Sequence, residues 1–261
     1  DAWRDSPHTP QRLVAINAMA LAFYRDCYRG SWAQPYLTER FGGDIADNPD
    51  IQPGYAPDGW TALVTHLRRH GVRDDELLAT GLASIASTGR LIDRFRDRAI
   101  FPIIHDGKIL GFVGRRNPSK PDYDPKNGPK YINTPDTLLF HKRAQLFTVG
   151  ARHLTNGGIP VVVEGPADAI AITLSTGGRY VGVAPLGTNL THEQAAQLRN
   201  LHAAPTIATD NDIAGQTAAQ RDYWILTPHN LQPRHAQLPD GADPADLLAT
   251  GHQTELQDAL E

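Results

Sequence analysis

The stretch Ile159-Pro-Val-Val-Val-Glu-Gly-Pro-Ala-Asp-Ala-Ile-Ala-Ile-Thr173 decides the fold of this chain. Its apolar run Val161–Val163 predicts a short buried strand. Gly165 and Pro166 end that strand, and apolar residues at helical spacing follow. Glu164 is therefore expected at the carboxyl end of a central strand, where open α/β sheets bind their ligands.

The same construction recurs forty-six residues later. The run 205–209 predicts a second strand, which ends at Asp210-Asn211-Asp212 before another helix begins. A period of two puts Asp210 and Asp212 on the same side of the chain. If the two strands are neighbours, Glu164 converges with both, and three close carboxylates cannot all stay ionised without a cation. Oxygen ligands of this kind suit Mg²⁺, or Mn²⁺ in its place.

The composition is that of an ordinary soluble globular protein. The chain has 261 residues, of which 40% are hydrophobic and 21% charged, enough for one large or two modest domains. No run of about 20 apolar residues exists, so nothing is expected to span a membrane, and a cytoplasmic protein is expected. The N-terminus has no Met and no signal-peptide pattern, so this sequence is expected to begin inside a longer natural chain. Cys27 is the only cysteine, and the eleven His lack the spacing of a zinc site. No zinc is therefore expected in this chain.

The charges are divided unevenly along the chain. Residues 90–143 hold twelve Lys and Arg against six Asp and Glu, a net charge of +6. Residues 158–261 hold four Arg against twelve Asp and Glu, a net charge of −8. A basic part beside an acidic part suits a protein that holds a phosphate backbone with one and metal ions with the other. Solvated surface charge is the alternative, and charge alone does not decide between them.

Periodicity and turn residues predict three parts and a C-terminal helix. Residues 1–89 are expected to be mostly helical, with a polar loop at 47–59 and with helices at 10–29, 33–40, 60–70 and 74–80. Residues 90–152 are expected to be basic and α/β, with a short helical piece at 136–140. Their strands 99–104 and 108–114 form a hairpin, because Asp106-Gly107 favours a tight turn between apolar runs. Residues 153–248 alternate strands and helices, and a C-terminal helix covers 249–261.

Several motifs give the chain a family resemblance. The units ending in Glu164-Gly165 and in Asp210-x-Asp212 resemble the Toprim domain, which DnaG-type primases, topoisomerases and some nucleases share. Further runs resemble those of bacterial DnaG-type primases: Arg94-Phe-Arg-Asp-Arg-Ala-Ile-Phe-Pro-Ile103, Gly111-Phe-Val-Gly-Arg115, Pro129-Lys-Tyr-Ile-Asn-Thr-Pro135 and Phe140-His-Lys142. Gly54-Tyr-Ala-Pro57, Trp60, Leu186-Gly-Thr188 and Leu238-Pro-Asp-Gly-Ala-Asp-Pro244 fit in the same order, so the resemblance spans about Tyr36 to Leu248.

The resemblance implies a fold, an activity and alternatives to that activity. The fold is α/β (α+β overall), with a helical and basic N-terminal subdomain (1–152), a Toprim domain with a mainly parallel sheet (153–248) and the closing helix. The implied activity is that of a DNA primase, a nucleotidyltransferase that makes short RNA primers on single-stranded DNA by two-metal catalysis. A Toprim nuclease with the same metals is one alternative. A non-catalytic nucleic-acid-binding module of a replication protein is another.

The resemblance also assigns residues to the metals. Glu164, Asp210 and Asp212 are the expected catalytic metal ligands. Asp168 lies one helical turn after Glu164 and is expected either to orient a metal-bound water or simply to be an acid at a helix N-terminus. Asp243 is expected to join the metals while capping a helix that starts at Pro244. Ala245 stands where the family often has a second acid, and Asp246 is expected to point away from the metals.

Nucleic acid and nucleotides are expected to bind to the basic part. The candidates are Arg96, Arg98, Arg115, Arg116, Lys130, Tyr131, Asn133 and Lys142. By resemblance, Arg115 and Lys130 lead this set, while a surface ion pair is the alternative for any single arginine. The implied partners are single-stranded DNA, ribonucleoside triphosphates, and a replicative helicase or zinc-binding module outside this chain, at the nucleoid or replisome. Residues 1–30 match no motif of the family.

Overall fold

The computed structural model of the chain describes residues 7–121, 128–201, 204–210 and 213–261, the side chain of Ile213 excepted. The chain divides into two compact units. The first comprises residues 1–36, 45–48 and 52–141, and the second comprises residues 37–44, 49–51 and 142–261. Helix α2 (Ala33–Arg40) begins in the first unit and ends in the second. None of the described helices combines the length and apolar character needed to cross a membrane.

The first unit is built on a four-stranded antiparallel sheet in the order β1-β4-β5-β6. Its helices are α1 (Pro10–Asp26), α3 (Ala62–Arg69) and α4 (Asp74–Ala79). Its strands are β1 (Gly54–Ala56), β2 (Ala83–Ile85), β3 (Leu91–Asp93), β4 (Arg98–His105), β5 (Lys108–Arg116) and β6 (Tyr131–Asn133). Strands β2 and β3 form a separate antiparallel pair.

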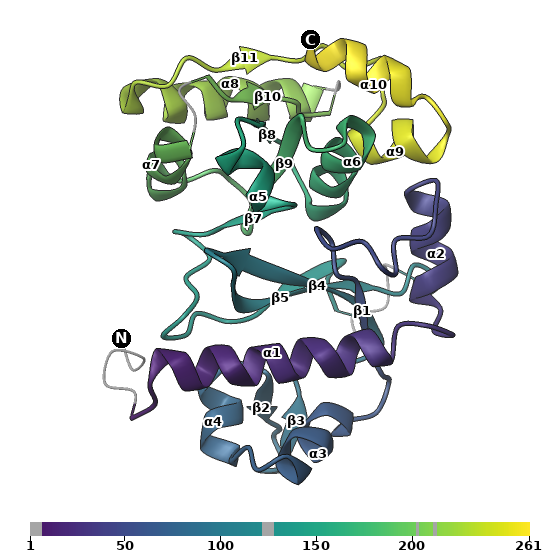
Figure 1. Cartoon of the computed structure of the whole chain (residues 1–261), viewed down its shortest axis with the longest axis vertical. Coiled ribbons are helices and arrows are strands. Elements are labelled where there is room, and N and C mark those ends of the chain that lie inside the picture. Colours follow the sequence, from purple (N-terminus) through teal and green to yellow (C-terminus); the bar gives the residue numbers. More distant parts are fainter. Residues whose placement is uncertain (1–6, 122–127, 202–203, 211–212) are drawn as a thin grey trace. The chain divides into compact units, whose positions relative to one another are not determined.

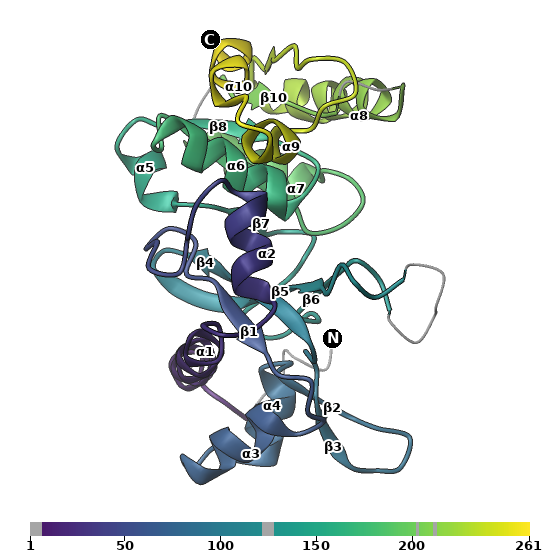
Figure 2. The same ribbon diagram turned by 90° about the vertical axis from the view of Figure 1, so that its right-hand side faces the viewer.

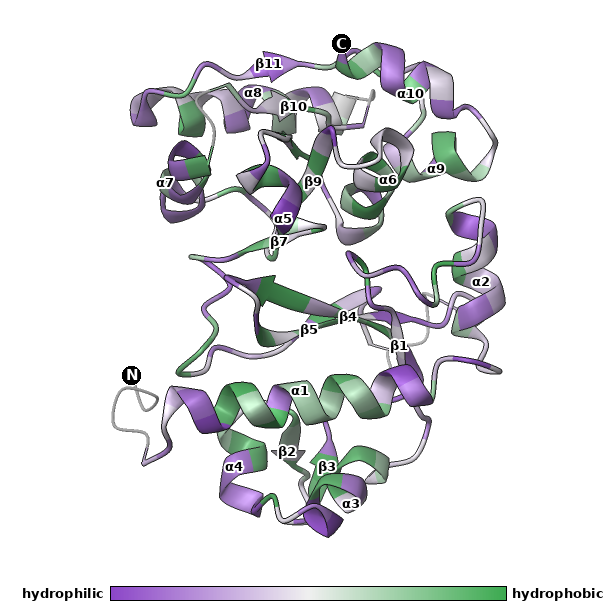
Figure 3. Ribbon diagram, viewed as in Figure 1, coloured by the Kyte–Doolittle hydropathy of each residue, from purple (hydrophilic) through white to green (hydrophobic). Residues whose placement is uncertain are grey.

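Helix α1 packs along the sheet of the first unit against β1 and β5 (Figures 1 and 2). Figure 3 shows an apolar middle and polar ends along this helix. Ile16, Ala20 and Tyr24 are fully buried and join Phe95 and Phe112 in the core of the unit. Burial of apolar area of this kind is the main stabilising contribution to such a fold. The N-terminal segment that matched no motif thus supplies a central core helix.

The hairpin of β4 and β5 forms as predicted. Asp106 and Gly107 have φ angles of 48° and 71°, which is the left-handed pair that a tight hairpin turn needs. In contrast, two predictions for this unit are wrong. Residues 54–56 of the expected loop form β1, because they pair with β4. Residues 136–140 form no helix, because the Thr137 hydroxyl accepts from the backbone N–H groups of Leu139 and Phe140 and makes a turn instead.

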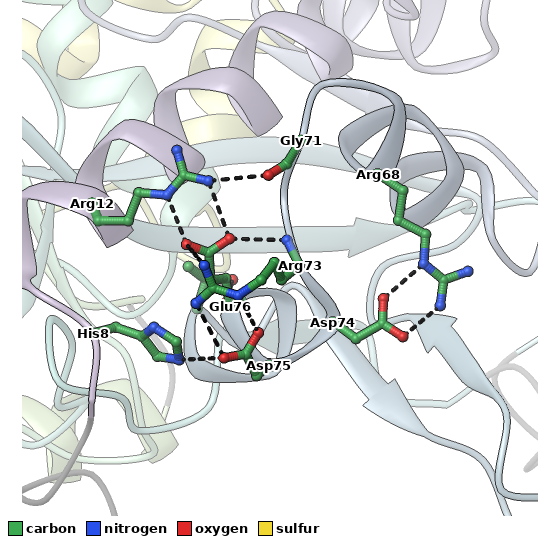
Figure 4. A network of polar contacts seen from close by, with 9 residues as sticks. His8, Arg12, Arg68, Gly71, Arg73, Asp74, Asp75 and Glu76 are labelled. Atoms are coloured by element: carbon green, nitrogen blue, oxygen red, sulfur yellow. Dashed lines mark hydrogen bonds and ion pairs between the residues drawn. The ribbon is translucent and has the colours of Figure 1, made fainter.

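A polar network joins α1 to α4 (Figure 4). The Glu76 side chain is only 2% exposed, and it accepts from Arg12 Nε at 2.8 Å and Arg12 Nη2 at 3.1 Å. The backbone N–H of Arg73 donates to the same carboxylate at 2.9 Å. These hydrogen bonds, that from Arg12 first, lower the pKa of Glu76 to about 2. The charged pair therefore fixes α4 against the start of α1.

The second unit is a mostly parallel five-stranded sheet in the order β11-β10-β8-β9-β7. Its strands are β7 (Leu146–Thr148), β8 (Ile159–Val162), β9 (Tyr180–Pro185), β10 (Thr206–Ile207) and β11 (Arg234–His235), with β7 antiparallel to β9. Its helices are α5 (Ala151–Thr155), α6 (Pro166–Thr176), α7 (His192–Leu201), α8 (Ile213–Leu226), α9 (Pro244–Ala249) and α10 (Gln253–Leu260), with a 3₁₀ turn η2 (Thr227–His229).

The connections of this sheet place helices on both faces. The chain passes from β8 through α6 to β9, and then from β9 through α7 back to β10 on the other side of β8. Because such crossovers are right-handed, α6 lies on one face, and α7 and α8 lie on the other (Figure 1). The strand order therefore reverses between β8 and β10. This is the predicted α/β architecture with a mainly parallel sheet.

Candidate functional site

Glu164 and Asp210 lie at the carboxyl ends of neighbouring strands. Strands β8 and β10 are parallel and in direct register, with Val162 opposite Ile207. The backbone N–H of Ala208 donates to the carbonyl of Val162 at 2.9 Å, which extends the pairing past the end of β10. These are also the strands between which the order of the sheet reverses, the position where open α/β sheets bind ligands. The pairing of β8 with β10, which the predicted site requires, is confirmed, and the site itself stays a prediction.

Asp168, in the first turn of α6, is the buried member of the acidic group. The residue is 9% exposed, and its Oδ1 accepts from the backbone N–H of Ala245 at 3.4 Å. Burial, reinforced by the charges of Asp243 and Asp210, raises the pKa of Asp168 to about 7. A carboxylate so close to two others and so poorly hydrated is the environment that a cation relieves.

Asp243 caps helix α9 as predicted. Its side chain accepts from the backbone N–H of Asp246 at 2.5 Å, and Pro244 occupies the first helical position. Arg40, at the end of α2, lies 3.4 Å from the Asp243 carboxylate and also pairs with Asp246. The guanidinium of Arg40 therefore supplies positive charge to the edge of the acidic group, from a helix two hundred residues away in sequence.

Asp168, Asp210 and Asp243 lie in one neighbourhood, which Glu164 joins only through the pairing of β8 with β10. Asp212 lies outside the described residues, so the structure does not place this predicted ligand. Within the described ranges, no three Asp, Glu, His or Cys side chains are close enough to hold a metal ion together. The donor set nevertheless fits a hard divalent cation, since it consists of carboxylate oxygens and includes the buried, mutually repelling Asp168.

Arg115 and Lys130 form a basic and aromatic face of the first unit, in which Lys130 is exposed and Arg115 is half-buried. Arg115 on β5 is paired in register with Tyr131 on β6. The guanidinium carbon of Arg115 lies 5.5 Å from the ring centre of Tyr131 and 5.7 Å from that of Tyr36. Lys130 is exposed, with Nζ 6.0 Å from the Tyr131 ring centre. Cations that stack on aromatic rings in this way are typical of surfaces that bind single-stranded nucleic acid.

A second cation–aromatic pair lies in the same unit. The guanidinium of Arg96 stacks 4.5 Å from the ring centre of Trp60, and the Trp60 side chain is 64% exposed. Arg96 also donates to the backbone carbonyl of Asp93. Exposing an indole ring to water costs free energy. The exposed ring of Trp60 offers a planar π-face on which a nucleic-acid base can stack.

Two of the predicted phosphate ligands are buried instead. Arg98 is 6% exposed and donates to the carbonyls of Gly114 and Pro129, each at 3.0 Å. Burial and the neighbouring arginines lower the pKa of Arg98 to about 10. Arg116 is 5% exposed and donates to the Gly128 carbonyl at 2.6 Å. Both guanidinium groups therefore bind backbone carbonyls inside the unit, and the expectation that they contact nucleic acid directly is corrected.

The remaining candidates divide between the two units. Asn133 on β6 is half-buried, and its backbone carbonyl accepts two hydrogen bonds from Arg94. Lys142 is exposed and belongs to the second unit, where its carbonyl accepts from Gln194 at 3.1 Å. Gln194 also forms a capping box with Thr191 at the start of α7.

The roles of two residues, Arg40 and Trp60, were not predicted from the sequence. Arg40 received no role, because its partners Asp243 and Asp246 lie about two hundred positions along the chain. Trp60 entered only as a matching motif residue, although its pairing with Arg96 gives it a chemical role. A single sequence holds no signal for either contact.

Comparisons with known proteins agree with this architecture. The family model described as "DNA primase catalytic core, N-terminal domain" matches residues 26–152, and the model described as "Toprim-like" matches residues 161–248. The DNA primase of Deinococcus radiodurans is 37% identical over 256 residues, covering 95% of this chain and 42% of that protein. The DNA primase of Mycobacterium tuberculosis is 36% identical, with 95% and 40% covered. The chain thus spans about two fifths of the length of these curated relatives.

The similar solved structures are also primases. The crystal structure of the RNA polymerase domain of Mycobacterium tuberculosis primase DnaG has a TM-score of 0.83 and 34% sequence identity, covering 96% of this chain and 83% of that one. The Aquifex aeolicus primase, solved with its zinc-binding and RNA polymerase domains, has a TM-score of 0.83 and 29% identity, with 96% and 60% covered. From its acidic strand ends to its basic face, the chain belongs to the family of DnaG-type bacterial DNA primases.

Proposed function

We propose that this chain is the catalytic core of a primase, which joins ribonucleotides into short RNA primers on a single-stranded DNA template. The observation that carries the proposal is the placement of Glu164 and Asp210 on neighbouring parallel strands at the point where the sheet order reverses. Asp168 and Asp243 lie in the same neighbourhood. Open α/β sheets place their ligands at such a point.

The metal ligands in this proposal are Glu164, Asp210, Asp212 and Asp243, and the ion is Mg²⁺ or Mn²⁺. Bound there, divalent ions would activate the attacking hydroxyl and neutralise the departing pyrophosphate. Asp168, held by the N–H of Ala245, keeps a further carboxylate next to the ligands. Arg40 orients Asp243 from the side through its ion pairs with Asp243 and Asp246. Its fixed positive charge also lowers the repulsion within the acidic group.

The template-binding face in this proposal is the basic and aromatic surface of the first unit. Arg115 and Lys130 would contact phosphates, while Tyr131 and Trp60 would stack on bases. Contacts to phosphate and to the faces of bases hold a strand without reading its sequence. Lys142, exposed in the second unit, adds a further cation. Asn133 belongs to this face through its place on β6 beside Arg94.

One experiment separates the proposed function from its alternatives. The chain is incubated with single-stranded DNA, Mg²⁺ or Mn²⁺ and labelled ribonucleoside triphosphates, and both RNA products and DNA lengths are measured on a sizing gel. A primase makes short RNA that depends on all three components. A Toprim nuclease shortens the DNA without needing ribonucleotides, and a non-catalytic module binds DNA but changes neither polymer. Asp210→Asn serves as the control, because it removes one charge and keeps the shape of the side chain.

The proposed partners extend beyond this chain. One similar structure includes a zinc-binding domain beside the RNA polymerase domain. By analogy, a zinc-binding module or a replicative helicase would help this core to choose where primers start. The corresponding test compares primer initiation with extension of a supplied primer, and the core by itself is expected to extend more efficiently than it initiates.

A further inference from the structure

Asp97 has an unusual backbone conformation for a buried acid. It lies between Arg96 and Arg98, directly before β4, and its φ angle is 49°. This is the left-handed region, which costs an L-residue free energy, although aspartate tolerates it better than most. The residue is nevertheless 7% exposed, so its carboxylate has been taken out of water. A strained and buried charged residue persists only where its surroundings hold it firmly.

Three donors from three separate segments converge on this carboxylate. The indole Nε1 of Trp32 donates to Oδ1 at 2.6 Å, and the hydroxyl of Tyr55 on β1 donates to the same oxygen at 2.8 Å. The ammonium of Lys120, beyond β5, lies 2.6 Å from Oδ2. Burial alone would raise the pKa of Asp97, but these donors outweigh it and hold the pKa below its usual range. The carboxylate therefore stays ionised and keeps its acceptor role.

The donors lead from Asp97 to the basic face. The Trp32 ring packs edge-to-face on Tyr55, with ring centres 6.0 Å apart, and it contacts Tyr36 with centres 5.9 Å apart. The rings of Tyr36 and Tyr131 flank the guanidinium of Arg115. This guanidinium also donates to the carbonyl of Arg116 at 2.8 Å. A continuous path of contacts thus runs from Asp97 through Trp32 and Tyr36 to Arg115. All of these residues belong to the first unit.

We propose that Asp97 is a positioning residue for the nucleic-acid-binding face. Its carboxylate fixes the rings of Trp32 and Tyr55, Trp32 holds Tyr36, and Tyr36 with Tyr131 keeps the guanidinium of Arg115 at a set place for a phosphate. The inference rests on the proposed function, in which Arg115 contacts nucleic acid. A plain ion pair with Lys120 does not account for the site, because two of the three donors are neutral groups on aromatic side chains.

The test is a double-mutant cycle on single-stranded DNA binding, measured with the whole chain. Asp97→Asn keeps the size of the side chain and its tolerance of a positive φ angle, but removes the charge that binds the donors. We expect Asp97→Asn to weaken binding about three- to ten-fold, which is the scale of a disturbed cation–π and phosphate contact. In a chain that already carries Arg115→Ala, Asp97→Asn should have no further effect, because residues that act through one another are not additive.

Two further measurements separate positioning from loss of structure. In ¹⁵N-Trp-labelled protein, the indole N–H resonance of Trp32, assigned with Trp32→Phe, should shift in Asp97→Asn. Glu76→Gln alters another buried carboxylate of the same unit, and it should lower the melting temperature without changing DNA affinity. If Asp97→Asn folds poorly, Tyr55→Phe and Trp32→Phe each remove one donor and leave the carboxylate, and they should give smaller losses that also vanish in the Arg115→Ala background.

The outcomes distinguish this inference from the proposed function. Wild-type affinity in Asp97→Asn, together with a normal loss in Arg115→Ala, overturns the positioning role alone. Fully additive losses in the double variant also overturn it, because Asp97 would then act elsewhere. Unchanged affinity in Arg115→Ala rejects the assignment of Arg115 under the proposed function, and the positioning role with it.

Discussion

At the scale of single residues, position on the sheet matters more for the acidic group than residue type alone. The described part of the chain holds many surface carboxylates, and several of them form ordinary ion pairs, such as Asp74 with Arg68. Glu164 and Asp210 differ, because β8 and β10 present them at the reversal point of the sheet. Asp168 differs again, because it is buried next to other acids.

The first prediction concerns those two strand-end residues. Glu164→Gln and Asp210→Asn remove a negative oxygen while keeping shape, so each should lower nucleotidyl transfer about 100-fold or more, as expected for losing a metal ligand. Neither change disturbs a packed core, so the melting temperature should stay within a few degrees of the wild type. Product yield and thermal denaturation are measured on the same preparations. Wild-type yield from Asp210→Asn would remove this residue from the site.

The second prediction separates Asp243 from Asp246. Asn also caps helices, so Asp243→Asn should cost little stability but lower activity and weaken its dependence on Mg²⁺. Asp246→Asn loses its favourable interaction with the helix N-terminus and its ion pair with Arg40, and should cost about 0.5 kcal/mol of stability with activity near wild type. Urea unfolding and Mg²⁺ titrations of activity are the measurements. Abolished synthesis in Asp246→Asn with unchanged melting would show that Asp246 serves as a ligand.

Residue roles were predictable where their partners are local. The cap at Asp243 could be read from Asp-Pro followed by Asp246, because all its groups lie within four positions. The burial of Arg98 could not be predicted in this way. Arg98 binds the carbonyls of Gly114 and Pro129, which lie on β5 and in the segment before β6. Asp93 is a similar case: it accepts from the backbone N–H groups of Leu63 and Val64 at the start of α3, thirty residues earlier.

At the scale of elements, the helices before residue 80 were predictable, and the three-residue strands of the first unit were not. Helix α2 has the predicted bounds, and the ends of α1, α3 and α4 lie within a few residues of the predicted ones, because apolar periodicity and Gly stops are local signals. Strand β1 is three residues long and exists because β4 pairs with it. Its sequence, Gly54-Tyr55-Ala56 between prolines, resembles a loop. Pairing partners that lie forty residues away leave no periodic signal.

The third prediction tests the attachment of α4 to α1. Arg12→Ala should lower stability by about 1 kcal/mol at pH 7, because it leaves the buried Glu76 carboxylate with fewer donors. The pKa of Glu76 is lowered to about 2 in the folded chain and is about 4.5 when unperturbed, so its contribution is complete above pH 4.5 and is lost as the pH falls towards 2. The stability difference between wild type and Arg12→Ala should therefore shrink over that range.

Chemical denaturation at pH 7 and at pH 3 measures this difference. Arg68→Ala is the matched control, since Arg68 forms a separate pair with the exposed Asp74 of α4 and should change stability little at either pH. A difference for Arg12→Ala that stays constant down to pH 2 would contradict the role given to the Glu76 charge.

The fourth prediction concerns how closely α6 packs on β9. A Cβ atom at Gly182 would lie 2.0 Å from the backbone oxygen of Ala169, a distance that no rotamer change can relieve because the obstacle is backbone. Gly182→Ala should therefore cost about 3 kcal/mol or fail to fold, which is the upper range for overpacking. Gly187→Ala is the control, because no atom lies within 4 Å of its Cβ position. Equal stability of the two variants in thermal denaturation would show that α6 and β9 are less closely packed than described.

At the scale of the whole molecule, the division of charge follows the division of the fold. The basic run of residues 90–143 falls almost entirely in the first unit, and the acidic run of residues 158–261 falls in the second. The sign of each unit was predictable from composition. The amount of positive charge exposed on the first unit was not predictable from composition, because Arg98 and Arg116 are buried. The number of cations that meet nucleic acid should thus be smaller than the sequence count implies.

The last prediction measures that number through salt dependence. Binding of single-stranded DNA releases counterions, so the logarithm of the affinity falls with the logarithm of the salt concentration, with a slope of about −0.7 for each phosphate contact. Lys130→Ala and Arg115→Ala should each flatten the slope by about 0.7, and together by about 1.4. Both variants should weaken binding alike on different sequences, because phosphate contacts do not read bases.

Arg68→Ala is the control, since Asp74 already pairs with this exposed arginine of the same unit, and its slope should match that of wild type. The exposed Lys130 has no such carboxylate partner among the described ion pairs, so its charge is available to a phosphate. The buried Arg116 provides the complementary case: Arg116→Met should leave the slope unchanged while lowering stability, because its guanidinium binds the Gly128 carbonyl inside the unit. A slope that flattens for Arg116→Met but not for Lys130→Ala would place the nucleic acid on a different surface of this chain.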